Sequence, residues 1–100
     1  MTKKIIYSDP VKLAEAIERG TGDKKQKIES VKIRKPMSGE LRGLRLVDLA
    51  NADVSSMITV IPRISEPALT EQELSEMDPS DFSNLAIEVV GFLEAKNATL

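Results

Sequence analysis

The sequence predicts a small α+β protein that is mainly α, with an N-terminal β-hairpin followed by three to four short helices in one compact domain. Three observations carry this prediction. The chain has 100 residues, which is enough for a single hydrophobic core. A β-branched segment of nearly alternating polarity lies in the first third of the chain. Beyond Ser38, apolar residues recur at the spacing of amphipathic helices.

The first twenty residues give mixed signals. Residues 1–12 show no clear period, and we expect a flexible leader there. Asp9 and Pro10 are typical of a helix start, and Gly20 is typical of a helix end. Local propensity therefore favours a short helix over residues 10–19.

The next segment favours the opposite interpretation of the same residues. The β-branched run at residues 28–33 predicts a strand. A lone strand must pair with another, and the candidates are residues 13–19 or residues 4–7. The first option gives a hairpin over residues 13–35, closed by Pro36, because proline cannot donate to a ladder. Strand and helix both remain open for the segment before Gly20.

Two helices are expected in the middle of the chain. Ser38 can N-cap a helix that continues to Ala50, in which Gly43 marks a close helix approach or a break. Asp53 can cap the second helix. Pro62 lacks the N–H that a helix interior needs, so we expect this helix to end or kink there.

Strong start signals mark the last two helices. Thr70 with Glu73 forms a capping box, and Asp78 precedes Pro79 at the first helical position with Asp81 two residues later. These signals complete a helical region over residues 38–95.

The last helix carries more apolar residues than one packed face needs. Phe82, Leu85 and Val89 lie on its main stripe, whereas Val90 and Phe92 widen it. Such a helix is either deeply buried or offers a surface to a partner.

The composition excludes most catalytic chemistry. The chain has no Cys and no His, so it lacks thiolates, the usual general base near neutral pH and the commonest metal ligands. We expect no catalytic residue, no cofactor and no metal. The N-terminus has no signal-peptide pattern, and no apolar run approaches the ~20 residues of a membrane span. We therefore expect a soluble intracellular protein without membrane contact.

Charge is divided unevenly between the two halves. Residues 1–50 carry twelve Lys/Arg against seven Asp/Glu, and residues 51–100 carry two against nine. The basic half either folds back on the acidic half or steers a charged partner. Nucleic acid is the weaker interpretation, because the basic stretch at residues 24–35 lacks aromatic side chains that stack on bases.

Several short motifs follow one another in fixed order from Lys35 onward. They are KPMSGELRGL at 35–44, DLANAD at 48–53, ITVIPRI at 58–64, LTEQELSEMDP at 69–79 and EVVGFL at 88–93. Together they resemble the tail assembly chaperone family of contractile-tailed, Mu-like bacteriophages. The resemblance covers about three quarters of the chain, counting the segments IERG and KIESVKIRK before it.

The resemblance implies a phage or prophage chaperone that binds the tape-measure protein and keeps it soluble and assembly-competent during tail morphogenesis. It implies action in the host bacterial cytoplasm and absence from the mature virion. Many members of the family also have a longer form made by frameshifting. Ala95-Lys96-Asn97 can be encoded with the slippery heptamer A-AAA-AAY, which suits this mechanism. The alternatives are a structural tail component kept in the virion and, less favoured, a nucleic-acid-binding regulator.

Partner-binding candidates lie in these motifs and are charged, have a flexible apolar side chain or belong to the wide last helix. They are Arg42, Leu44, Met57, Arg63, Met77, Val90 and Phe92. For the two arginines, the alternative is an ion pair with an acid across the helices, and for the two methionines it is the core. We also expect self-association. The motif residues with structural roles are Pro36, Gly43, Asp53, Pro62, Thr70, Asp78 and Pro79.

Overall fold

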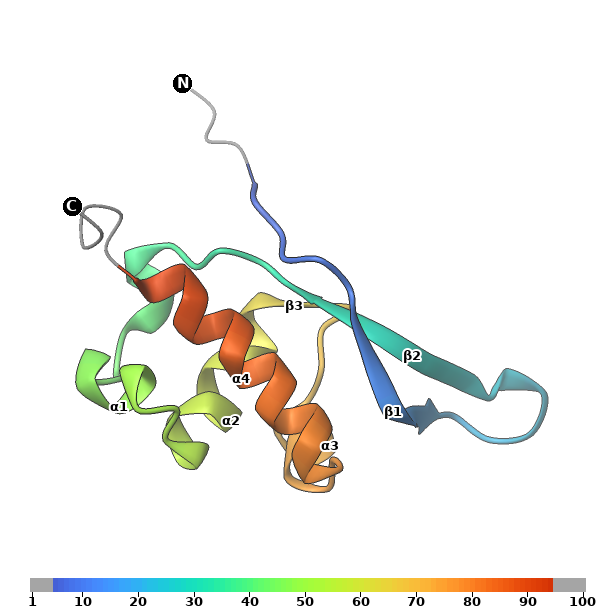
Figure 1. The fold of residues 1–100 in the computed structure, drawn as a ribbon. Coiled ribbons are helices and arrows are strands. Elements are labelled where there is room, and N and C mark those ends of the chain that lie inside the picture. The colour runs from blue at the N-terminus through green and yellow to red at the C-terminus, as the bar shows by residue number, and fades with distance from the viewer. Residues whose placement is uncertain (1–4, 95–100) are drawn as a thin grey trace.

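The computed structural model describes residues 5–94 and places a long hairpin beside a helical body (Figure 1). The elements in chain order are β1 (Val11–Arg19), η1 (Gly22–Lys24), β2 (Gln26–Ile33), η2 (Ser38–Leu41), α1 (Leu46–Ala50), α2 (Val54–Ile64), β3 (Ser65–Glu66), α3 (Glu71–Ser75) and α4 (Pro79–Leu93). The predicted α+β class, a hairpin followed by four helices, is confirmed.

The ambiguous segment before Gly20 is a strand. β1 pairs antiparallel with β2, with Val11 opposite Val31. Gly20 has φ +81°, and a Cβ there would lie 2.6 Å from the carbonyl oxygen of Lys24. Because only glycine fits this turn, the chain reverses into a hairpin and the local helix propensity is overridden.

The middle of β1 leaves the ladder in a wide bulge. Lys12 pairs with Ser30 and Ile17 pairs with Ile28, so residues 13–16 face a single residue of β2. Asp81, the acid in the first turn of α4, lies against this bulge and is only 1% exposed.

The Asp81 carboxylate satisfies the backbone donors that the bulge releases. Its Oδ1 accepts from the N–H of Ala14 at 2.7 Å, and its Oδ2 accepts from the N–H of Glu15 at 3.0 Å. Buried backbone N–H groups need such partners. Asp81 therefore connects the middle of the hairpin to the start of α4.

The sheet extends beyond the hairpin on both sides of β2. The N–H of Ser8 donates to the carbonyl of Ile33 at 2.7 Å, and the N–H of Lys35 donates to the carbonyl of Ile6 at 2.7 Å. Ile6 and Ser8 both lie in the segment that was expected to be a flexible leader. On the opposite edge, β3 pairs antiparallel with the end of β2, with Ser65 opposite Ile33. The strand order is β1-β2-β3.

The prediction of a single helix from Ser38 to Ala50 is wrong. The chain forms the short 3-10 helix η2, turns at Gly43 with φ +85°, and only then begins α1. Gly43 is a break and not a close helix approach, because a Cβ there would meet nothing within 4 Å. Ser38 is not the N-cap; Met37 is, and its N–H donates to the Glu40 carboxylate at 2.9 Å.

The other helix starts are confirmed. Asp53 caps α2 by accepting from the N–H of Ser56 at 3.0 Å. Thr70 and Glu73 form the reciprocal capping box of α3. Asp78 caps α4, with Pro79 at its first position.

For α2, the sequence predicted an end or a kink at Pro62. The helix continues through Pro62 and ends at Ile64, two residues beyond the proline. Pro62 therefore lies in the last turn of α2, so its missing N–H removes a helical hydrogen bond only near the end of the helix.

The core is formed by residues of the hairpin and of all four α-helices and is almost wholly aliphatic. Its buried members are Leu13, Ile28, Val31, Ile33, Leu49, Met57, Val60, Ile61, Ile64, Leu69, Leu74, Leu85, Ala86 and Val89. α4 contacts both strands of the hairpin on one side and α1 and α2 on the other. Across residues 5–94, none of the helices combines the length and the apolar character needed to cross a bilayer.

Candidate functional site: an apolar groove

An open groove of about 580 Å³ separates α4 from the corner between α1 and α2. One wall consists of Ala50, Ala52 and Val54. The other is a face of α4 that carries Phe82, Ser83, Ala86, Ile87, Val90 and Gly91. We call this feature the apolar groove.

The local sequence explains why the space between these walls stays open. α1 is a short helix, and Ala52, with φ +56°, ends it before Asp53 starts α2. The chain therefore turns a corner here, and the alanines on it are too small to fill the space up to α4. Val54 is 59% exposed and Ile87 is 63% exposed. Two large aliphatic side chains thus face solvent on opposite walls, which is typical of a partner-binding surface.

The charges at the groove are acidic. Glu94, the C-cap of α4, is the one charged residue that lines it among the residues described. Asp53 lies in sequence between the lining residues Ala52 and Val54. The groove therefore offers apolar surface with one acidic residue at the end of α4.

A second exposed apolar surface lies at the N-terminal end of the sheet. We call it the N-terminal patch, formed by Ile5, Ile6 and Met37, which are 59%, 44% and 42% exposed. Arg34 and Lys35 line the same depression. Lys35 is thus a basic residue beside this patch, whereas the charged residue beside the groove is Glu94.

The structure places the apolar candidates at different depths. Val90 lines the apolar groove. Met57 is 0% exposed and belongs to the core, so it presents no surface. Leu44, Met77 and Phe92 are half-buried and pack against the core. Phe92 is thus less exposed than its place off the main stripe of α4 suggested.

Within residues 5–94, Arg63 binds backbone carbonyl groups and forms no ion pair with an acid across the helices. Its guanidinium donates to the carbonyl of Glu40 at 2.7 Å and to that of Arg42 at 3.1 Å. Arg42 itself is exposed. Arg63 therefore holds η2 and its C-cap against α2, which is a structural role.

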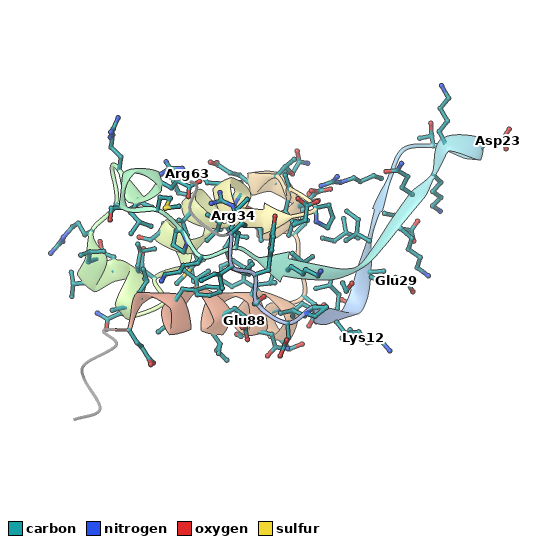
Figure 2. The ribbon with its side chains drawn as sticks, turned by 90° about the horizontal axis from the view of Figure 1, so that it is seen from above. Lys12, Asp23, Glu29, Arg34, Arg63 and Glu88 are labelled. Atoms are coloured by element: carbon teal, nitrogen blue, oxygen red, sulfur yellow. The ribbon has the colours of Figure 1, made fainter. Side chains whose placement is uncertain are left out.

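Arg34 completes this cluster, and the sequence did not single it out. Its guanidinium forms two hydrogen bonds with the Glu40 carboxylate, at 2.8 and 2.5 Å, and a third with the carbonyl of Arg63 at 2.9 Å. Figure 2 shows Arg34 and Arg63 close together. The hydrogen bonds from Arg34, followed by the one from the Met37 N–H, lower the pKa of Glu40 to about 2. Glu40 thus stays ionised well below neutral pH.

The site contains no arrangement suited to metal chemistry. In the part of the chain from residue 5 to residue 94, no three Asp or Glu side chains converge so as to hold an ion. What the arrangement can do is bury apolar surface of another molecule.

Comparison with known proteins identifies the family. The family model described as phage tail assembly chaperone proteins, E, or 41 or 14, matches residues 11–94. The chain belongs to this family. This confirms the resemblance found in the motifs. Because the members are assembly chaperones, the expected non-enzymatic role is confirmed as well.

Two proteins of Escherichia phage P2 are similar to this chaperone. Tail assembly protein E is 42% identical over 83 residues, which cover 83% of this chain and 87% of that protein. Tail assembly protein E′ is 42% identical over 86 residues, which cover 86% of this chain and 58% of that protein. The chain thus spans just over half the length of E′. No solved structure matches the chain at a significant level.

Proposed function

We propose that this tail assembly chaperone binds the tape-measure protein and keeps it soluble and assembly-competent during tail morphogenesis, in the cytoplasm of the host bacterium. The observation that carries the proposal is the apolar groove, where Val54 and Ile87 are more than half exposed on facing walls. Grooves of this kind receive the apolar face of an amphipathic helix. A long helical protein whose apolar stripes are covered in this way has less surface available for aggregation.

Co-expression with the tape-measure protein tests the proposal. We expect the tape measure to be more soluble with the chaperone than without it and to co-purify with it. Ile87→Ser should reduce both effects, because it removes exposed apolar surface from the groove wall. Leu46→Ser is the matched control, since Leu46 is also 63% exposed but does not line the groove. A tape measure that is equally soluble alone and never co-purifies would refute the proposed function.

We further propose that the protein is absent from the mature virion. A chaperone that covers tape-measure surface must leave before the tail tube occupies that surface. Mass spectrometry of purified particles separates this proposal from the alternative, a structural tail component. Stoichiometric amounts of the chain in mature tails would favour the alternative.

A longer form of the protein is also part of the proposal. The similarity to both E and the longer E′ of phage P2 supports it. Residues 95–97, where the slippery codons are expected, lie outside the described residues. The nucleotide sequence tests the idea directly, because a GCG codon for Ala95 or an AAG codon for Lys96 would remove this slip site. We expect the short form to associate with itself or with the longer form, which co-purification of differently tagged copies would reveal.

A further inference from the structure

We propose that the apolar groove binds one α-helical segment that approaches α4 closely at Gly91 and places a Lys or Arg beside Glu94. The inference rests on the proposed function, because it describes the segment of the tape-measure protein that this chaperone would recognise. The occupant is defined by its chemistry: an apolar stripe at i, i+3, i+4 and i+7, with a basic residue at one end.

Gly91 gives the first argument, because nothing within the described chain requires a glycine there. It lies inside α4, its φ is outside the left-handed region, and a Cβ would meet nothing within 4 Å. Glycine within a helix costs up to about 1 kcal/mol relative to alanine. Its common structural benefit is close approach of another backbone. Gly91 lines the groove, so the approaching backbone is that of a molecule in the groove.

Charge gives the second argument. Glu94 lines the groove at the end of α4, where the helix dipole is also negative. Among residues 5–94, no Lys or Arg lines the groove. An apolar helix laid over Glu94 would leave its carboxylate partly desolvated without a partner, which is unfavourable. A basic residue at that end of the bound helix removes this cost and fixes the direction of the helix.

The same charges disfavour a second copy of this chain as the occupant. Within its described bounds α4 contains Asp81 and Glu88 and no basic residue. α3 contains Glu71 and Glu73 and no basic residue. Either helix placed in the groove of another copy would bring acid against acid. α3 and α4 of a second copy are therefore poor occupants, and a helix of a different protein that carries basic residues fits the groove better.

Peptides that tile the tape-measure protein test the inference. Peptides of about 25 residues form up to seven helical turns and are titrated against the full chaperone. We expect one or a few apolar peptides with a flanking Lys or Arg to bind. Gly91→Leu should weaken that binding by about tenfold or more, equivalent to about 1.4 kcal/mol. Glu94→Lys should weaken it by several-fold, on the order of the ion pairs measured at interfaces, and should make it less sensitive to salt.

Gly91→Ala gives the sharpest result, because its two effects should have opposite signs. Alanine should raise the thermal stability of the chaperone through helix propensity. It should also weaken peptide binding, because its Cβ occupies the point of close approach. Asn84→Ala is the control, since Asn84 is exposed on α4 and does not line the groove. It should raise stability in the same way and leave peptide binding unchanged.

The possible outcomes separate this inference from the proposed function. If the chaperone binds the tape measure and Gly91→Leu binds equally well, the groove is not the site and the proposed function survives. If neither the peptides nor the whole tape measure binds wild type, the proposed function fails. If replacing the flanking Lys and Arg by Gln leaves affinity unchanged, the charge argument is wrong. If Gly91→Leu converts a dimer of the chaperone to a monomer without affecting peptide binding, the occupant is a second copy.

Discussion

The hairpin and the helical body of this chaperone are stabilised in different ways. The body is held by aliphatic side chains such as Leu49 and Ile61, both 0% exposed. The hairpin adds apolar residues only along part of its length, and every residue from 20 to 27 is exposed. Figure 2 shows Asp23 at its tip, far from the helices. The hairpin is therefore held by apolar residues along part of its length and by a few polar contacts, whereas the body depends on apolar contacts throughout.

Two charged contacts fix the hairpin against the helices. Asp81 binds the bulge of β1, as described above. Arg19, at the end of β1, forms two hydrogen bonds of 2.7 Å with the Glu73 carboxylate of α3 and one of 2.6 Å with the carbonyl of Ala68. Single substitutions at these points should shift the hairpin without unfolding the body. The following predictions test that difference.

The largest loss of stability should come from the core. Leu85 is 0% exposed on α4, between the hairpin and the other helices. Leu85→Ala should lower the free energy of unfolding by about 2–5 kcal/mol, because it removes apolar contacts and leaves a cavity. Chemical denaturation measures the loss. Ile87→Ala on the exposed side of α4 is the control and should cost far less. A loss below about 1 kcal/mol at Leu85 would mean that the core repacks there.

Asp81→Asn should have the next largest effect. The amide oxygen can accept one of the two N–H groups of the bulge, but the amide nitrogen then faces the other donor. We expect the free energy of unfolding to fall by about 1–3 kcal/mol. Hydrogen exchange should become faster at Ala14 and Glu15, and exchange in the helices should change little. Asp48→Asn is the control, since its contact with Arg45 is long, at 4.0 Å. Uniformly faster exchange throughout the helices would show that the hairpin and the body unfold together.

Glu73→Gln should have the third largest effect. We expect it to lower the free energy of unfolding on the order of 1 kcal/mol at neutral pH, because the hydrogen bonds between Glu73 and Arg19 are only partly exposed. The Arg19 guanidinium lowers the pKa of Glu73 from 4.5 to about 2. A lowered pKa means that the stabilisation is complete above about pH 4.5 and is lost as the pH falls toward 2. The melting temperatures of wild type and Glu73→Gln should therefore converge across this range. Curves that stay parallel down to pH 2 would contradict the assignment.

The sequence predicted the features that depend on neighbouring residues. The caps at Asp53, Thr70 and Asp78 satisfy N–H groups only two or three residues away, so their pattern is visible in the sequence. For Gly43 the sequence left a break or a close helix approach open, and the structure shows the break. The extra apolar width of the last helix left deep burial or an exposed surface open; the structure exposes Ile87, whereas Phe92 packs against the core.

The contacts that the sequence did not reveal join distant segments. Asp81 and Ala14 are 67 positions apart, and Arg19 and Glu73 are 54 apart. An acid in the first turn of a helix is explained locally by the helix dipole, so nothing in the sequence indicated a second role for Asp81. For Met57 the sequence left partner contact and core both open, because the spacing of a methionine does not tell a core position from a surface one, and the structure places it in the core.

The smallest effect should come from the tip of the hairpin. An ion pair there has almost the same N–O distance as the pair between Arg19 and Glu73. Lys25 and Glu18 lie 2.6 Å apart, close to the 2.7 Å between Arg19 and Glu73. Their side chains, however, are 59% and 52% exposed, against 32% and 18% for the other pair. Water and salt screen the tip pair, so Lys25→Ala should leave the melting temperature unchanged in a thermal denaturation assay. If Lys25→Ala lowered it as much as Glu73→Gln does, distance alone would decide the strength of these pairs, and the hairpin would be stabilised along its whole length.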